Sequence, residues 1–459
     1  MTETQIDADG LAARLRGALV RPDDPGYDEA RELYNAMIDK RPALIARVAD
    51  VDDVVAAVNF GRESGLEVAI RGGGHNGAGL ASVDGGLVVD LSALNGVDVD
   101  PEARTVTIGG GALLGGVDRA TNAHGLATPA GIISTTGAGG LMLGGGVGYL
   151  TRRAGLSIDN ILGAQVVLAD GSVVDTDERT EPELFWAIRG GGGNFGVVTS
   201  LTSRLHPVGD VVAGPMFWDL DSAGDILGWY REFILSAPEE LGGFFLFASV
   251  PPAPPFPEEL HLRKVAAVIW CWTGPPEQAD DVLADARVQP GLLLDGVQPM
   301  PLPALQSAFV PVYPAGDQWY WRGDFVREIP DAAIEVHQRF AERMPTWKST
   351  MHLYPIDGAA HRVGPADTPW AYRDANWAAV IAGVDPDPAN AKAITAWTVE
   401  YFQALHPYSA GGSYVNFLGE GEDRVQATYG DNYARLAAIK AQYDPENLFH
   451  VNQNIRPAA

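Results

Sequence analysis

The sequence predicts an α+β protein built as two domains, and three observations support this prediction. The chain has 459 residues, whereas a single hydrophobic core stops growing at roughly 250 to 300 residues. Up to about residue 205, short β-branched runs, amphipathic segments and glycine-rich turns follow one another. Beyond that point prolines crowd together and Trp and Tyr become frequent. We therefore expect a first domain at residues 1–205 and a second, with long strands and helices, at residues 206–410.

The first clear element is an amphipathic helix within residues 50–65. Asp50 is the expected N-cap, apolar residues recur at helical spacing, and Gly65 ends the helix. A second helix is expected from Leu113 to His124. Short β-branched runs bounded by turn residues predict strands at residues 66–71, 87–91 and 104–109.

A hairpin signal follows at residues 164–177, where Asp170-Gly171 separates two apolar runs. A short helix is expected at residues 183–190, and the chain then returns to strand. Near the C-terminus we expect a strand at residues 411–417 and an amphipathic helix at residues 427–444, which Asp444-Pro445 ends.

Composition excludes several classes of partner. The formal net charge of -27 disfavours a nucleic-acid backbone or an anionic membrane, because both would be repelled. No run of about 18 apolar residues is present, and residues 1–24 lack the features of a secretory signal. Cys271 is the single cysteine, so a disulfide within the chain is impossible and a cytoplasmic location is favoured. We expect no metal site.

Three glycine clusters stand out: RGGGHNGAG from Arg71, GAGGLMLGGGVG from Gly137 and RGGGGNFG from Arg189. Glycine allows backbone N–H groups to gather around an anion such as a pyrophosphate, so the clusters indicate a nucleotide site. Each cluster alone is more often a tight turn. A Rossmann unit would open a helix directly after the glycines, whereas here the first cluster holds a histidine and leads into a further loop and strand. The pattern favours another nucleotide-binding fold.

Four segments carry a family resemblance: RGGGHNGAGLASVDGGLVVDLSALNGV, AGIISTTGAGGLMLGGGVGYLTRRAGLSIDNILGAQVVLADG, ELFWAIRGGGGNFGVVTS and YGDNYARLAAIKAQYDPENLFHVNQNI. In order and spacing they resemble the berberine-bridge-enzyme-like branch of the vanillyl-alcohol-oxidase (PCMH-type) flavoproteins, and within it the bacterial 6-hydroxynicotine-oxidase-like type. The resemblance implies an FAD-binding domain from about residues 38–207, completed by residues 411–459. A substrate domain of antiparallel sheet covered by helices is then inserted at residues 206–410.

The resemblance also implies that the FAD is covalently held. In the family the histidine of the GGH motif is joined to the 8α-methyl group of the flavin, and His75 occupies that position. Many relatives have a second link through a cysteine, where this chain has Ile133. We therefore expect a single covalent link, through His75.

Further cofactor contacts are implied at positions that match the family motifs. Arg71 to Gly77 are expected to surround the pyrophosphate. A segment that begins just ahead of the second cluster and continues into it is expected to run along the flavin ring and the ribityl chain. Asp159 and Asn160 are expected to support that segment, Val197 to lie near the adenosine, and Asn452 and Asn454 to close the site. The full set is Arg71, Gly72, Gly73, Gly74, His75, Asn76, Gly77, Ser134, Thr135, Gly137, Gly140, Gly144, Gly145, Gly148, Asp159, Asn160, Val197, Asn452 and Asn454.

For the reaction, the resemblance implies hydride transfer from a small organic substrate to flavin N5, with Tyr414 as the proton acceptor. If residues 354–363 form a strand, alternation places Arg362 on one face and His361 on the other. Arg362 would then lower the pKa of Tyr414 or bind a substrate anion, and His361 would replace it if a bulge shifts the register. Thr136 stands where a valine-sized residue leaves room for O2, which favours an oxidase that produces H2O2.

Several alternatives remain open at this stage. An alcohol, a sugar or a secondary metabolite is the expected substrate, but an amine of the 6-hydroxynicotine type is also compatible, as is a dehydrogenase that reacts slowly with O2. A flavin-binding protein that has lost its activity is the alternative outside enzymes. Trp319 and Trp321 either stack on a planar substrate or belong to a core. The chain is expected to act as a monomer or a homodimer.

Overall fold

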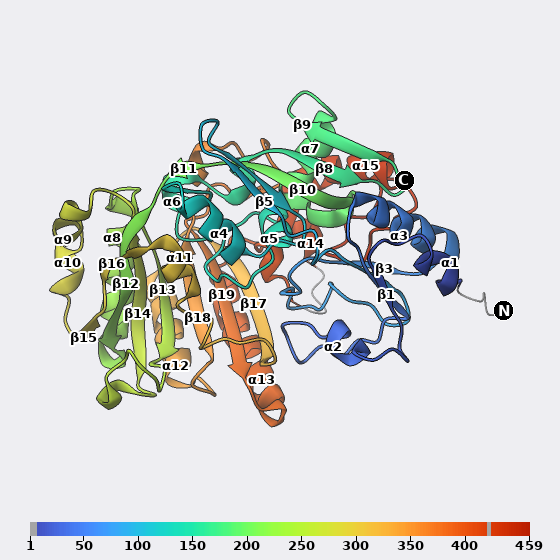
Figure 1. The fold of residues 1–459 in the computed structure, drawn as a ribbon. Helices are drawn as coiled ribbons and strands as arrows, with labels where there is room; N and C mark the ends of the chain where they lie inside the picture. Colours follow the sequence, from blue (N-terminus) through green and yellow to red (C-terminus); the bar gives the residue numbers. More distant parts are fainter. Residues whose placement is uncertain (1–6, 420–423) are drawn as a thin grey trace.

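The structure is a computed structural model that describes residues 7–419 and 424–459. It contains four β-sheets, and Figure 1 shows the largest of them standing beside the part of the chain that carries both termini. In the described part, no helix has the length and apolar character needed to cross a membrane. The domain limits at residues 205 and 410 stay a prediction.

Three small sheets form the N-terminal part. The first has the order β1-β2-β4-β3, with β2, β4 and β3 parallel and β1 antiparallel to β2, and the second has the order β5-β6-β10-β8-β9 and is antiparallel throughout. The third pairs β7 with β11. The strands are β1 (Ala18–Val20), β2 (Leu44–Arg47), β3 (Val68–Arg71), β4 (Leu87–Asp90), β5 (Val97–Asp100), β6 (Thr105–Gly109), β7 (Leu126–Ala127), β8 (Ile161–Val167), β9 (Val173–Asp177), β10 (Val197–Arg204) and β11 (His206–Pro207).

Seven helices accompany these sheets, and several confirm sequence predictions. Asp50 accepts a hydrogen bond from the backbone N–H of Asp53, 3.1 Å away, and Gly65 ends the helix with φ +67°. The predicted hairpin is β8 and β9, with Gly171 at φ +85° in the turn. The helices are α1 (Ala8–Ala12), α2 (Tyr27–Arg31), α3 (Val51–Ser64), α4 (Leu114–Asn122), α5 (Ala138–Leu143), α6 (Thr151–Ala154) and α7 (Pro182–Gly191).

The fourth sheet is antiparallel and has eight strands, seven of them in the order β15-β12-β14-β13-β18-β19-β17, while β16 pairs with β12. One of its faces packs against α8, α12 and α13 to form a separate core that includes Trp218, Trp270 and Tyr401. The strands are β12 (Asp210–Asp219), β13 (Leu241–Ser249), β14 (Lys264–Trp272), β15 (Leu292–Asp295), β16 (Gln298–Pro301), β17 (Gln318–Val326), β18 (Thr350–Pro355) and β19 (Trp377–Asp385). The helices of this part are α8 (Ala223–Ser236), α9 (Ala279–Val282), α10 (Ala284–Arg287), α11 (Leu302–Ser307), α12 (Asp331–Glu342) and α13 (Ala391–Leu405).

The two faces of this sheet have different partners because side chains alternate along a strand. In β18, Met351 and Leu353 join the core beneath the helices. Tyr354 belongs to the other core, which also contains the segments around the second glycine cluster. The sheet therefore turns one face to its own helices and the other toward the glycine-rich part of the chain.

The helix-covered core contains a buried histidine with a consequence for stability. Nδ1 of His337 lies 2.6 Å from the hydroxyl of Tyr401, and burial lowers the pKa of His337 from 6.5 to about 3. Because the unfolded chain binds this proton more readily, the stabilising contribution is complete above pH 6.5 and is lost as the pH falls.

We therefore expect that, as the pH falls from about 6 to 4, the free energy of unfolding decreases more steeply in the wild type than in His337→Gln, by about 1.4 kcal/mol per pH unit. Urea unfolding of both proteins at a series of pH values measures the difference. Parallel pH profiles would show that folding does not lower the pKa of His337.

The C-terminal segment returns to the N-terminal part. Two sequence predictions within this segment need correction, as does the strand predicted at residues 354–363. Residues 411–417 are not a strand but a loop that ends in a 3-10 turn at Val415–Phe417. The helix predicted at residues 427–444 is divided into α14 (Val425–Tyr429) and α15 (Tyr433–Tyr443), because Gly430 adopts φ +50° between them. The strand predicted at residues 354–363 ends at Pro355, and Gly358, at φ +66°, begins a 3-10 turn.

Candidate active site

A cavity of about 400 Å³ lies between the glycine clusters and the eight-stranded sheet. One wall consists of the loops that hold the three clusters. The opposite wall consists of side chains from β17, β18 and β19, and the C-terminal segment after α15 closes a third side. The site is therefore assembled from segments that are distant in the sequence.

The glycine wall brings backbone to backbone and leaves room for a ligand. A Cβ added at Gly73 would lie 2.4 Å from the backbone nitrogen of Gly137, so only glycine permits the first two clusters to approach this closely. A Cβ added at Gly140, Gly192 or Gly193 would meet no atom within 4 Å, although all three residues line the cavity. The wall is a smooth concave surface of backbone.

His75 lies half-buried in this wall, in the loop that follows β3. Its ring is stacked on Tyr34, with ring centres 3.8 Å apart and an angle of 19° between the planes. Burial lowers the pKa of His75 from 6.5 to about 4, although a hydrogen bond with the Thr135 backbone partly opposes this effect. The imidazole is therefore neutral near pH 7, which leaves a nitrogen lone pair available for bonding. Ile133 also lines the cavity and offers no second nucleophile.

About half of the predicted cofactor residues line the cavity, including residues from the first cluster, the second cluster and the C-terminus. Those that line it are Gly72, Gly73, Gly74, His75, Asn76, Gly137, Gly140, Gly144 and Asn452, and Thr136 lies with them. The cavity lining does not include Arg71, Gly77, Ser134, Thr135, Gly145, Gly148, Asp159, Asn160, Val197 or Asn454.

Most of the residues outside the lining support the wall from behind. Arg71 forms a buried ion pair with Asp90, with Nη2 2.7 Å from Oδ2. Asp159 is likewise paired with Arg373, and the side-chain amide of Asn160 donates to the carbonyls of Ala154 and Leu156. The side chain of Val197 packs in the core beneath α3.

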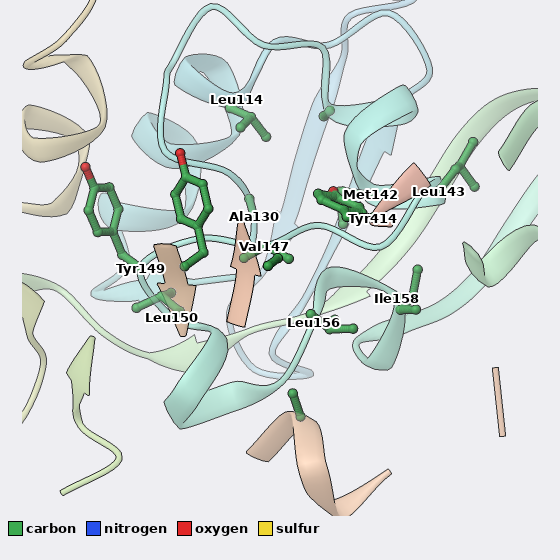
Figure 2. Close-up of a cluster of buried hydrophobic side chains, with 14 of the residues drawn as sticks. Leu114, Ala130, Met142, Leu143, Val147, Tyr149, Leu150, Leu156, Ile158 and Tyr414 are labelled. Carbon is green, nitrogen blue, oxygen red and sulfur yellow. The ribbon is translucent and has the colours of Figure 1, made fainter. Parts of the chain in front are cut away.

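Tyr414 lines the cavity, but its hydroxyl is engaged in hydrogen bonds. The oxygen accepts hydrogen bonds from the backbone N–H of Gly146, at 2.9 Å, and from Nδ2 of Asn416, at 2.7 Å. Figure 2 shows the ring in the hydrophobic cluster that contains Met142 and Leu143. Burial raises the pKa of Tyr414 to about 12, even though the two donors lower it. Tyr414 therefore joins the C-terminal loop to the second glycine cluster.

Arg362 and His361 do not reach the cavity, so the roles predicted for them are wrong. Arg362 forms a surface ion pair with Glu239, with nitrogen to oxygen distances of 2.5 and 2.9 Å. Nε2 of His361 lies 2.9 Å from the carbonyl oxygen of Ala375. The physical reason is the turn at Gly358, which ends the strand alternation on which both roles depended.

The sequence reasoning missed a pair of polar side chains on the sheet wall. Nδ1 of His352 lies 2.5 Å from the hydroxyl of Tyr354, and both residues line the cavity. Nε2 of His352 is buried and has no hydrogen-bond partner in the described part of the chain. The signal was present in the segment STMHLYP, because residues two apart on a strand share a face. Which face meets the cavity depends on the tertiary structure.

Comparison with known proteins agrees with this architecture. Residues 42–177 match the family described as "FAD binding domain", and residues 413–456 match "Berberine and berberine like". The chain is 30% identical to an FAD-linked oxidoreductase of Dictyostelium discoideum, with 96% of this chain and 95% of that protein covered. It is 31% identical to (R)-6-hydroxynicotine oxidase of Paenarthrobacter nicotinovorans, with 96% and 97% covered.

The structural comparison gives the same result. The crystal structure of 6-hydroxy-D-nicotine oxidase from Arthrobacter nicotinovorans superimposes with a TM-score of 0.86 at 27% sequence identity. The match covers 97% of this chain and 98% of that chain. The likeness therefore extends to both sheet systems and to the C-terminal segment.

Proposed function

We propose that this chain, which belongs to the berberine-like family of FAD-linked oxidoreductases, holds FAD covalently through His75 and oxidises a small organic molecule. The family and the two-domain FAD-binding fold that the sequence predicted are confirmed. The observation that carries the finer proposal is the neutral imidazole of His75 in the glycine wall of the cavity.

The residues of the cavity fit FAD. Gly140, Gly192 and Gly193 leave open space where other residues would place a side chain, as a large planar cofactor with a diphosphate requires. Oδ1 of Asn452 is buried at the cavity without a hydrogen-bond partner, so a polar group of a ligand would satisfy it. When bound, FAD accepts a hydride from the substrate and delivers the electrons to an acceptor.

The chain itself positions the reactants. The ring of Tyr34 restricts the orientation of His75, so one ring nitrogen is presented to the cofactor. With FAD bound, that nitrogen would hold the cofactor through a bond to its 8α carbon. The sheet wall excludes water from the opposite side and holds the substrate close to the cofactor, which lowers the entropic cost of the reaction.

Oxygen is the electron acceptor that we propose. Thr136 lines the cavity in the loop before α5, and its side chain is small. A side chain with one more non-hydrogen atom than threonine would narrow the cavity at this point. We therefore expect Thr136→Ile to slow reoxidation of the reduced enzyme by O2 on the order of tenfold, while Thr136→Val leaves the rate unchanged. Stopped-flow mixing of the reduced enzyme with O2 gives the rate, and equal rates in both variants would refute this role.

Two measurements test the proposal as a whole. The mass of the denatured protein is expected to include one FAD. A panel of alcohols, sugars and amines is then mixed with the enzyme without oxygen, and bleaching of the flavin absorbance identifies substrates. Readmission of oxygen should restore the colour and release H2O2. Reduction without reoxidation would make the protein a dehydrogenase, and an absence of bound FAD would reject the proposal.

An amine is the second candidate substrate. The observation that favours it is the full-length similarity to (R)-6-hydroxynicotine oxidase. An amine that enters as the neutral base requires no proton acceptor before the hydride leaves. The alcohol and amine members of the panel separate these two cases.

A further inference from the structure

Two polar side chains of the sheet wall form a hydrogen-bonding pair with each other. His352 and Tyr354 lie two residues apart on β18, with 2.5 Å between Nδ1 and the hydroxyl oxygen. Nε2 of His352, on the other side of the ring, is buried and has no hydrogen-bond partner among residues 7–419 and 424–459. A buried polar atom that no protein group satisfies points to a ligand, because such an atom is costly when it stays unpaired.

The rest of this wall indicates what kind of ligand fits. Trp319, Trp321 and Phe417 line the cavity, and the indole N–H groups of both tryptophans are buried without a partner. Within residues 7–419 and 424–459, no Asp, Glu, Lys or Arg is among the lining residues. A buried charge without a counter-ion is strongly unfavourable, so a carboxylate or an ammonium group would bind poorly. Flat, uncharged rings with hydroxyl groups match these walls.

We infer that His352 is the catalytic residue that accepts the hydroxyl proton of an uncharged aromatic alcohol, and that Tyr354 is its positioning residue. The inference rests on the proposed function, which supplies the oxidant. The substrate carbon loses a hydride to FAD, and the O–H bond breaks as its proton moves to Nε2 of His352. The electron pair of that O–H bond becomes the second bond of the product carbonyl, so atoms and electrons balance.

The hydrogen bond to Tyr354 sets the protonation of the ring. When Nδ1 carries the hydrogen and donates a hydrogen bond to the hydroxyl oxygen of Tyr354, Nε2 presents a lone pair to the cavity. Burial lowers the pKa of His352 to about 3, which keeps the ring neutral and ready to accept a proton. A weak base suffices here, because an alcohol becomes strongly acidic as its hydride leaves.

Tyr414, the proton acceptor predicted from the resemblance, fits this role less well. Its oxygen already accepts hydrogen bonds from Gly146 and Asn416, whereas Nε2 of His352 is unoccupied. Removal of Tyr414 would loosen the wall of the cavity, so a Tyr414 variant does not separate the two roles. Variants of His352 do.

The catalytic test uses 4-methoxybenzyl alcohol and anaerobic reduction of the flavin. His352→Gln keeps an atom that accepts a hydrogen bond but cannot take up the proton, and reduction should slow on the order of 100-fold or more. Tyr354→Phe should slow reduction on the order of tenfold with little change in KM, because the proton acceptor remains but loses its orientation. Covalent FAD should be present in every variant. Reduction at the wild-type rate in His352→Gln would overturn the inference.

The chain offers a matched control. His337 and Tyr401 form a second short histidine–tyrosine contact, which is buried under the helices on the other face of the sheet. His337→Gln removes a buried histidine of the same kind but does not touch the cavity, so flavin reduction at pH 7.5 should stay within about twofold of the wild type. An equal slowing in both glutamine variants would assign the effect to stability and overturn the inference.

A binding measurement tests the same contact without turnover. In phenol the carbon that bears the hydroxyl group carries no hydrogen, so no hydride can leave it. Anisole is similar in shape but has no hydroxyl proton. Titration followed by the flavin difference spectrum should show that the wild type and His352→Gln prefer phenol over anisole about tenfold, the value of one neutral hydrogen bond. His352→Leu should lose that preference. A preference that survives in His352→Leu would place the hydroxyl elsewhere and overturn the inference.

The charge of the substrate is tested with a matched series. 4-Carboxybenzyl alcohol and 4-(aminomethyl)benzyl alcohol differ from the methoxy compound in the charge of one substituent. Each should reduce the flavin at least about tenfold less efficiently, as kcat/KM, than the neutral compound. Equal efficiency for a charged member would overturn the substrate class. If no alcohol in the panel reduces the flavin while an amine does, the proposed oxidoreductase function stands and this inference fails.

Discussion

His75→Ala is expected to abolish covalent attachment of FAD completely. In the wild type, denaturation should leave the flavin on the polypeptide, and in the variant all flavin should appear in the supernatant after acid precipitation. The reason is that His75 is the nucleophile in the glycine wall: Ile133 is a hydrocarbon, Cys271 is buried in β14, and His352 lines the opposite wall of the cavity. Intact mass and in-gel flavin fluorescence measure the outcome.

The variant should still fold and bind FAD reversibly, since the glycine wall does not depend on the imidazole. His361→Ala is a suitable control because His361 lies outside the cavity, and its covalent FAD content should equal that of the wild type. Covalent FAD in His75→Ala would show that another residue forms the bond. Attachment should also be insensitive to pH between about 5.5 and 8, because a ring with a pKa of about 4 is neutral throughout that range.

Local signals explain the parts of the fold that sequence reasoning predicted. The helix at Val51–Ser64 begins with a side-chain cap at Asp50 and ends at a glycine with positive φ, and both signals lie within the helix or next to it. The hairpin of β8 and β9 depends on the turn residues Asp170 and Gly171 in the same way. The glycine clusters predicted one wall of the cavity because, at positions such as Gly73, close backbone approach excludes every other residue.

Nonlocal contacts explain what was missed. Residues 354–363 contain nothing that forbids a strand, but a Cβ at Gly358 would lie 2.5 Å from the backbone oxygen of Arg152. Next to it, Asp357 forms a buried ion pair with Arg152, with Nε 2.8 Å from Oδ1. The chain turns there to meet α6. The sequence could predict that His352 and Tyr354 share one face of a strand and lie close together. That this face borders a cavity could be seen only in the tertiary structure.

Lys440→Met is expected to reduce the free energy of unfolding by about 3–5 kcal/mol, the cost of breaking a buried ion pair. Lys440 and Asp444 are essentially unexposed, at 0% and 1%, with 2.6 Å between Nζ and Oδ2. Nζ also donates to the carbonyl oxygens of Asn194, at 2.6 Å, and Phe449, at 3.0 Å. Methionine fills the same space but removes the ammonium donor from both carbonyls and from the Asp444 carboxylate, which keeps its backbone N–H donors from Leu448 and Phe449 but loses its buried counter-charge. Urea unfolding of the variant and the wild type measures the loss.

An exposed ion pair between α15 and α7 provides the control. Arg435 and Glu183 have side-chain exposures of 42% and 50%, so Glu183→Gln should cost less than about 1 kcal/mol. The double variant Lys440→Met/Asp444→Asn should recover part of the stability lost in Lys440→Met, because it removes the unpaired buried charge. Equal costs for the buried and exposed pairs would contradict the prediction.

The position of Lys440 links this stability to the cofactor. Asn194 belongs to the third glycine cluster, and Phe449 precedes the C-terminal residues that close the cavity, and both line it. The ammonium group of Lys440 therefore joins two walls of the cavity that lie more than 250 residues apart in the sequence. The Lys440→Met variant should lose reversible FAD affinity as well as stability when it is combined with His75→Ala, whereas Glu183→Gln in the same background should not. Flavin fluorescence titration of the two double variants decides whether the buried pair supports the site or only the fold.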